Sequence, residues 1–174
     1  MPRVVIHTDS GEIELEVDSV RAPVTAANFL RYVDRGRYDG GRFHRAVTLA
    51  NQPTDSVRIE VIQGSATAQP GVDTVPPIPL ERTSVTGILH RDATVSMARG
   101  RGPDTARSDF FVCIGDQPSL DFGGRRNLDG QGFAAFGRVT RGMDVVRKIQ
   151  RIPTTGQRLT PPVAILSAKR VAGS

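Results

Sequence analysis

The chain has 174 residues, of which 38% are hydrophobic and 24% charged, with 18 Gly and 12 Pro. This composition is typical of one globular, loop-rich domain, and it excludes a disordered chain, a collagen and a coiled coil. The formal net charge is +5, and no apolar run approaches the roughly 20 residues that a membrane-spanning helix needs. We therefore expect a single domain over residues 1–174 with no membrane partner.

The first elements are predicted to be a hairpin and a helix. Apolar and polar residues alternate over Val4–Thr8 and Ile13–Val17, on either side of a turn-forming Asp-Ser-Gly cluster. From Ala22 to Val33 the apolar residues recur at helical spacing, with Pro23 near the start and Gly36 just after the end.

The rest of the chain is predicted to be mainly β-structure. Six short runs rich in β-forming residues are bounded by turn-forming clusters: Arg42–Val47, Arg58–Gly64, Thr94–Ala98, Asp109–Ile114, Ala134–Val139 and Val163–Val171. A second amphipathic helix is predicted over Met143–Gln150. Eight strands and two helices favour an all-β fold, a closed or nearly closed antiparallel barrel whose open ends the helices cover.

Three long connections are expected to carry function, because loops on a rigid scaffold often do. They are Thr48–Val57, Ser65–Ala93 and Asp116–Gly132. The single cysteine, Cys113, lies in an apolar strand and excludes an internal disulfide. No Cys/His spacing matches a zinc site, so we expect neither metal nor cofactor.

The basic residues and the histidines are individually uninformative. Arginine supplies all but two of the 23 basic residues, which suits an anion-binding surface, but the basic residues form no run or stripe, and this favours scattered arginines on a solvated surface. His7, His44 and His90 have no motif partner, so structural or surface roles are expected for them.

The start of the chain leaves two compartments open. Arg3-Val4-Val5-Ile6 begins almost inside a strand, with no targeting pattern ahead of it. The protein is expected to be cytoplasmic as written, or periplasmic if a signal peptide has been removed.

An ordered series of motifs is the most informative feature of the sequence. The blocks are Phe43-His44-Arg45, Val61-Ile62-Gln63-Gly64, Ser96-Met97-Ala98-Arg99, Ser108-Asp109-Phe110-Phe111-Val112 and Phe136-Gly137-Arg138-Val139. Together with the opening hairpin and helix, this series resembles the cyclophilin family of peptidyl-prolyl cis-trans isomerases. The resemblance implies a closed eight-stranded antiparallel β-barrel with a helix at each end, and an outer groove that binds a proline-containing peptide.

The same resemblance assigns candidate site residues. Arg45 is similar to the catalytic arginine of the family, and Gln63 to the residue that donates to a substrate carbonyl. The implied substrate-binding residues are Phe43, Val61, Ala98, Arg99, Asp109, Phe111, Leu120 and Phe133. Phe111 would form the floor of the proline pocket, and the backbone at Ala98 and Arg99 would hold the peptide.

Several positions depart from the family pattern. Arg45 and Gln63 are 18 positions apart, so Leu49–Arg58 is expected to be an inserted surface loop beside the groove. Glu60 replaces a phenylalanine, Phe133 a histidine, and Asp109 a glutamine. The family's tryptophan corresponds to Ser119 or Asn127, and the chain has no tryptophan. We expect the Asp109 carboxylate to pair with Arg45.

These residue types suit rotation about an X-Pro bond. The barrier of about 18–20 kcal/mol comes from amide resonance, and the twisted nitrogen regains a lone pair that a fixed cation can stabilise. The predicted function is therefore prolyl isomerisation in flexible segments of client proteins, by a protein expected to be a monomer. The alternatives are a proline-peptide-binding module or holdase with weak turnover, and an arginine-driven nucleic-acid binder, which the scarcity of aromatic residues disfavours.

Overall fold

The computed structural model describes residues 1–68 and 75–174. Residues 69–74, in the predicted connection Ser65–Ala93, lie outside the described residues. Within the described part, no helix is long and apolar enough to cross a membrane.

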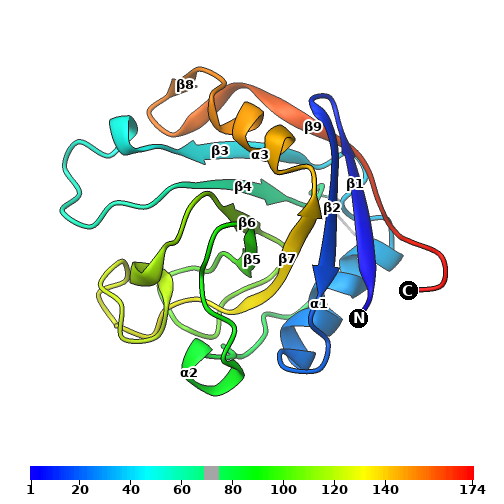
Figure 1. Cartoon of the computed structure of the whole chain (residues 1–174), viewed down its shortest axis with the longest axis horizontal. Helices are drawn as coiled ribbons and strands as arrows, with labels where there is room; N and C mark the ends of the chain where they lie inside the picture. Colours follow the sequence, from blue (N-terminus) through cyan, green and yellow to red (C-terminus); the bar gives the residue numbers. More distant parts are fainter. Residues whose placement is uncertain (69–74) are drawn as a thin grey trace.

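Eight antiparallel strands form a closed barrel, which confirms the predicted fold. Their order is β1-β2-β7-β5-β6-β4-β3-β9, and a β1–β9 pairing closes the ring; the short β8 pairs with β9 alone. The strands are β1 (Arg3–Thr8), β2 (Gly11–Val17), β3 (Arg42–Val47), β4 (Val61–Ser65), β5 (Thr94–Met97), β6 (Phe110–Cys113), β7 (Ala135–Arg141), β8 (Thr154–Thr155) and β9 (Arg158–Arg170). In Figure 1, β1 and β2 run across the direction of β3 and β4.

Both predicted helices are present, and a third, shorter one was missed. Helix α1 (Pro23–Asp34) and helix α3 (Met143–Gln150) lie on opposite sides of the barrel in Figure 1. Helix α2 (Thr83–Thr86) lies in the long connection after β4 and ends at Gly87, whose φ is 73°. Four residues are too few to show a helical repeat of apolar positions, so the sequence pattern could not reveal α2. Two 3-10 turns, Leu49–Asn51 and Pro118–Leu120, are the other helical segments within residues 1–68 and 75–174.

The barrel interior holds the main hydrophobic core. The rings of Phe43 and Phe110 meet edge-on inside the barrel with centroids 5.6 Å apart, and Phe29 of α1 packs on Phe110. Phe43 has no exposed surface, so our prediction that it binds substrate is wrong. Side chains alternate between the two faces of a strand, and Phe43 takes the inner one.

A second, smaller hydrophobic cluster is separate from the interior core. Its buried members are Val47, Ile59, Val61, Phe111, Cys113 and Leu120, with Ala98 and Phe133 packed against them. Burial raises the pKa of the Cys113 thiol well above its usual range, which fits the inert thiol expected from the sequence. This outer cluster is the apolar base on which the candidate site is built.

Candidate active site

A β-bulge in β3 turns two consecutive side chains toward the outside of the barrel. The register of β3 against both β4 and β9 shifts between Phe43 and Arg45. Phe43 and Ala46 are buried, whereas His44 and Arg45 between them are both partly exposed. A bulge re-aims side chains in this way, and here it presents Arg45 to the groove.

The central residues of the site are direct neighbours across three strands. Arg45 is in register with Gln63 on β4, and Gln63 with Phe111 on β6. The Arg45 Nη1 atom donates to Gln63 Oε1 at 3.0 Å. The predicted pairing of a guanidinium, an amide and an aromatic pocket floor is thus built from one row of cross-strand neighbours.

Asp109 contacts Gln63 rather than Arg45. The Gln63 Nε2 atom donates to Asp109 Oδ2 at 2.9 Å, and His44 Nε2 lies 3.8 Å from the same oxygen. Our expectation of a direct Asp109–Arg45 ion pair is therefore wrong. The Gln63 carboxamide fills the space between the two charged groups.

A second amide, from Gln157, holds the other edge of the Arg45 guanidinium. The Nε and Nη2 atoms of Arg45 donate to Gln157 Oε1 at 3.0 and 2.7 Å. Gln157 Nε2 in turn donates to the Asn51 carbonyl at 3.3 Å. Burial, and next the charge of Arg126, lower the pKa of Arg45, but an arginine remains protonated in proteins.

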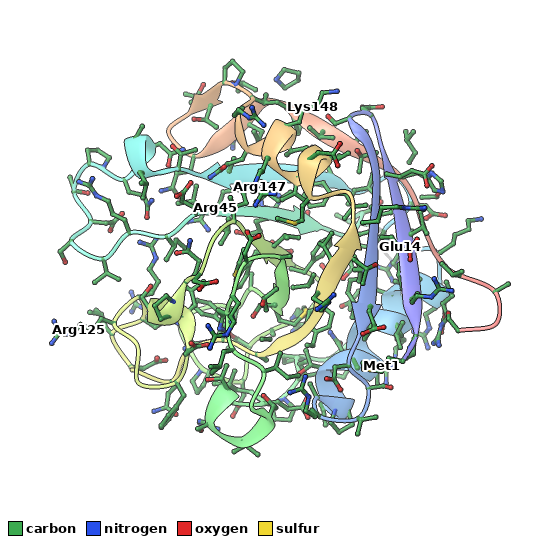
Figure 2. The ribbon with its side chains drawn as sticks, viewed as in Figure 1. Met1, Glu14, Arg45, Arg125, Arg147 and Lys148 are labelled. Carbon is green, nitrogen blue, oxygen red and sulfur yellow. The ribbon has the colours of Figure 1, made fainter. Side chains whose placement is uncertain are left out.

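The apolar side chains predicted for the proline pocket come together around one cavity of about 330 Å³. Predicted residues that line this cavity are Arg45, Gln63, Val61, Ala98, Arg99, Phe111, Leu120 and Phe133. Ile59, Arg126 and Asn127 line it too, and only Asn127 had been considered, as a possible replacement for the tryptophan. In Figure 2 Arg45 lies beside β3 and β4, while Arg125, in the loop next to Arg126, points away from the body of the protein.

Phe111 is held in place from two sides. The His90 ring stacks on it with centroids 5.9 Å apart, and the Phe133 ring meets it edge-on at 5.4 Å. His90 is buried and bonds to Asp121 Oδ1 at 2.7 Å and to Ser96 Oγ at 2.8 Å. Ser96 has no exposed surface, so this Ser-His-Asp arrangement cannot reach a substrate and supports the pocket floor. The structural role expected for His90 is confirmed.

Arg99 uses its side chain to fix the wall of the pocket. Its Nη2 atom donates to both carboxylate oxygens of Asp129 at 3.0 Å, and its Nε to the Gly132 carbonyl at 3.0 Å. The guanidinium also lies 5.2 Å from the centroid of the Phe133 ring. The guanidinium of Arg99 therefore orders the segment that carries Phe133.

The inserted segment Leu49–Arg58 is anchored to the site more firmly than we expected. Gln52 is buried, donates to the Thr48 and Ile59 carbonyls and accepts from the Ile59 N–H. Arg126 donates to Gln52 Oε1 at 3.1 Å and to the Val57 carbonyl at 2.8 Å. Only the tip of the insertion is a surface loop, because Gln52 at its base is bonded to Ile59 and Arg126, two residues that line the pocket.

The replacement of a phenylalanine by Glu60 does not place a charge in the pocket. Gln150 of α3 donates to Glu60 Oε2 at 2.9 Å, and Glu60 does not line the cavity. Its neighbour Ile59 is buried and lines the cavity instead. The apolar character of this wall is thereby kept.

Comparison with known proteins identifies the family. The family described as "Cyclophilin type peptidyl-prolyl cis-trans isomerase/CLD" matches residues 3–170. The chain is 34% identical over 174 residues to the peptidyl-prolyl cis-trans isomerase cyp18 of Streptomyces antibioticus, covering 97% of this chain and 98% of that protein. It is 32% identical over 152 residues to the peptidyl-prolyl cis-trans isomerase B of Escherichia coli, covering 87% of this chain and 85% of that protein. The chain belongs to the cyclophilin-type peptidyl-prolyl cis-trans isomerase family, whose activity is that isomerisation.

A solved structure agrees with the fold. The cyclophilin type peptidyl-prolyl cis-trans isomerase of Cryptosporidium parvum, determined in the presence of the dipeptide Ala-Pro, superimposes with a TM-score of 0.77. The alignment covers 98% of this chain and 99% of that chain at 19% sequence identity. The barrel topology is therefore shared over the whole length.

Proposed function

We propose that Arg45 is the catalytic group of this isomerase and that it acts on X-Pro bonds of flexible polypeptide segments seated in the groove. The proposal is carried by one observation: a guanidinium held on two edges by amide oxygens borders a cavity of about 330 Å³ that has a cluster of apolar side chains at its base. A cavity of this size and lining suits a proline ring. The Ala-Pro dipeptide of the Cryptosporidium parvum structure supports the same class of ligand.

The reaction needs no covalent step. As the amide twists, the proline nitrogen loses its resonance with the carbonyl and becomes an acceptor, so a fixed cation stabilises the twisted state more than either planar isomer. Arg45 is that cation, and the floor made by Phe111 keeps water away from it. Each 1.36 kcal/mol of such selective stabilisation raises the rate about tenfold.

Gln63 has a second role in this proposal. One N–H of its carboxamide donates to Asp109, while its oxygen accepts from Arg45. The amide nitrogen carries two hydrogens, so one remains for a peptide carbonyl. Gln63 would thus hold the substrate backbone beside the catalytic cation.

The test is cis-trans exchange of a short Ala-Pro peptide, followed by NMR, alongside the dissociation constant for the same peptide. The proposal predicts that the protein accelerates cis-trans exchange of the peptide. It also predicts that Phe111→Ala binds the peptide more weakly while its barrel remains folded. Binding without accelerated exchange would instead establish the weak-turnover binding module. We also propose a monomeric protein with no nucleic-acid partner. Sedimentation should therefore give one 18.8 kDa species, and steeply salt-dependent RNA binding would contradict the absence of a nucleic-acid partner.

A further inference from the structure

A second, larger cavity adjoins the catalytic arginine on the side opposite the proline pocket. Its volume is about 570 Å³, and Arg45 lines both cavities. Arg45 stands in register between Gln63 on β4 and Arg158 on β9, so the row of cross-strand neighbours continues past Arg45 into this cavity. A peptide whose proline occupies the first cavity would run into the second with a flanking residue.

The charged groups of this second cavity are mostly positive. Arg42, Arg45 and Arg158 contribute three guanidinium groups to its lining, against the single carboxylate of Asp109. That carboxylate is already engaged by the Gln63 amide at 2.9 Å and has His44 at 3.8 Å. The cavity therefore has more positive charge than its own residues neutralise.

Two of the three arginines are available to a ligand. Arg45 donates to two glutamine side chains, whereas Arg42 and Arg158 are exposed, and no described residue offers either of them a carboxylate within ion-pair distance. Pro162 and Leu159 supply apolar surface beside them. Guanidinium groups bind carboxylates with directed, charge-assisted hydrogen bonds.

We infer that this cavity is a subsite for an acidic side chain of the substrate, and that Arg42 and Arg158 make the isomerase prefer X-Pro segments with a glutamate or aspartate on one flank of the proline. The inference rests on the proposed function of the groove and adds a substrate preference to it. Because both arginines are exposed, we expect a preference of about three- to tenfold that weakens with salt.

The experiment compares matched peptides that carry either Glu or Gln at one position within two residues of the proline, on either side. Both kcat/KM and the dissociation constant are measured for each pair. We expect Glu to be preferred about three- to tenfold at a position on one flank only, and the preference to fall in about 0.5 M NaCl. The double variant Arg42→Gln/Arg158→Gln should lose the preference and keep its rate on the Gln peptides.

The control is Arg35→Gln/Arg138→Gln, which removes the same charge from exposed residues after α1 and on β7, outside both cavities. It should retain the preference. Equal values for Glu and Gln peptides at every position would overturn the inference, as would a preference that survives in Arg42→Gln/Arg158→Gln. Failure of every peptide to show accelerated exchange would instead refute the proposed function, while the dissociation constants would still decide for or against the acidic subsite.

Discussion

Arg45 and Asp109 are linked through a single carboxamide: Gln63 accepts from the guanidinium at 3.0 Å and donates to the carboxylate at 2.9 Å. Arginine can only donate and an ionised carboxylate can only accept, so the two partners fix which end of the Gln63 amide faces which charge. The carboxylate therefore orients Gln63 and also lowers the positive potential near Arg45.

Substitution of Asp109 should separate these two effects. Asp109→Asn keeps an oxygen that can accept from Gln63 and removes the charge, so kcat/KM is expected to rise severalfold. Asp109→Leu removes the acceptor, frees Gln63 to rotate and should lower kcat/KM. If kcat/KM falls as far in Asp109→Asn as in Asp109→Leu while both proteins remain folded, the negative charge itself is needed for activity.

Gln157 is expected to be a positioning residue for Arg45, the proposed catalytic group. Its Oε1 accepts from two nitrogens of Arg45, so Gln157→Ala should let the guanidinium move and lower kcat about three- to thirtyfold with KM little changed. Thr155→Ala, an exposed position in the same hairpin, is the matched control. An unchanged kcat in Gln157→Ala would show that Gln63 alone is sufficient to hold Arg45.

The base of the inserted segment should contribute to stability. Gln52→Ala leaves the buried Ile59 N–H without its acceptor, which costs about 1–3 kcal/mol and should lower the melting temperature by several degrees. Ser56→Ala, at the exposed tip of the same segment, should leave the melting temperature unchanged. Equal melting temperatures for Gln52→Ala and Ser56→Ala would mean that the segment does not stabilise the barrel.

Asp18 should make stability depend on pH. Burial alone would raise the pKa of its carboxyl, but hydrogen bonds from the Arg21 N–H and guanidinium and from the Val20 N–H outweigh it and hold the pKa below its usual value. A depressed folded-state pKa gives stability that is present above the unfolded value of about 3.9 and is lost as the pH falls through the folded value.

The pH dependence can be measured with one substitution. Asp18→Asn should lower the melting temperature at pH 7 by the equivalent of about 1 kcal/mol, and the difference from the unsubstituted protein should shrink below about pH 4. A difference that stays constant from pH 7 to about pH 2.5 would show that the charge of Asp18 does not contribute.

The fold was predictable because its signals are local or repeated along the chain. Alternation marked β1 and β2, and runs of β-forming residues between turn-forming clusters marked the other six barrel strands. The helical spacing over Met143–Gln150 matches α3 residue for residue. The four residues of α2 carry no such signal. The inward position of Phe43 was missed because the cyclophilin resemblance supplied its role, whereas the bulge at His44 sets which face each neighbour takes.

The sequence predicted most of the residues that form the candidate site, but few of the contacts between them. The row Arg45, Gln63 and Phe111 follows from motifs that the sequence displays. The contact of Gln157 with Arg45 spans 112 positions along the chain, and neither residue type indicates it. Arg126 looked like one more surface arginine, because only the folded insertion supplies the carbonyl of Val57 that it binds.

The role of Arg45 is tested most directly by Arg45→Ala, with cis-trans exchange and peptide binding measured on the same sample. We predict that kcat/KM falls by about one to three decades, that the dissociation constant for the Ala-Pro peptide changes far less, and that the melting temperature stays close to that of the unsubstituted protein. A folded Arg45→Ala protein that isomerises the peptide at the full rate would contradict the assignment of Arg45 as the catalytic cation.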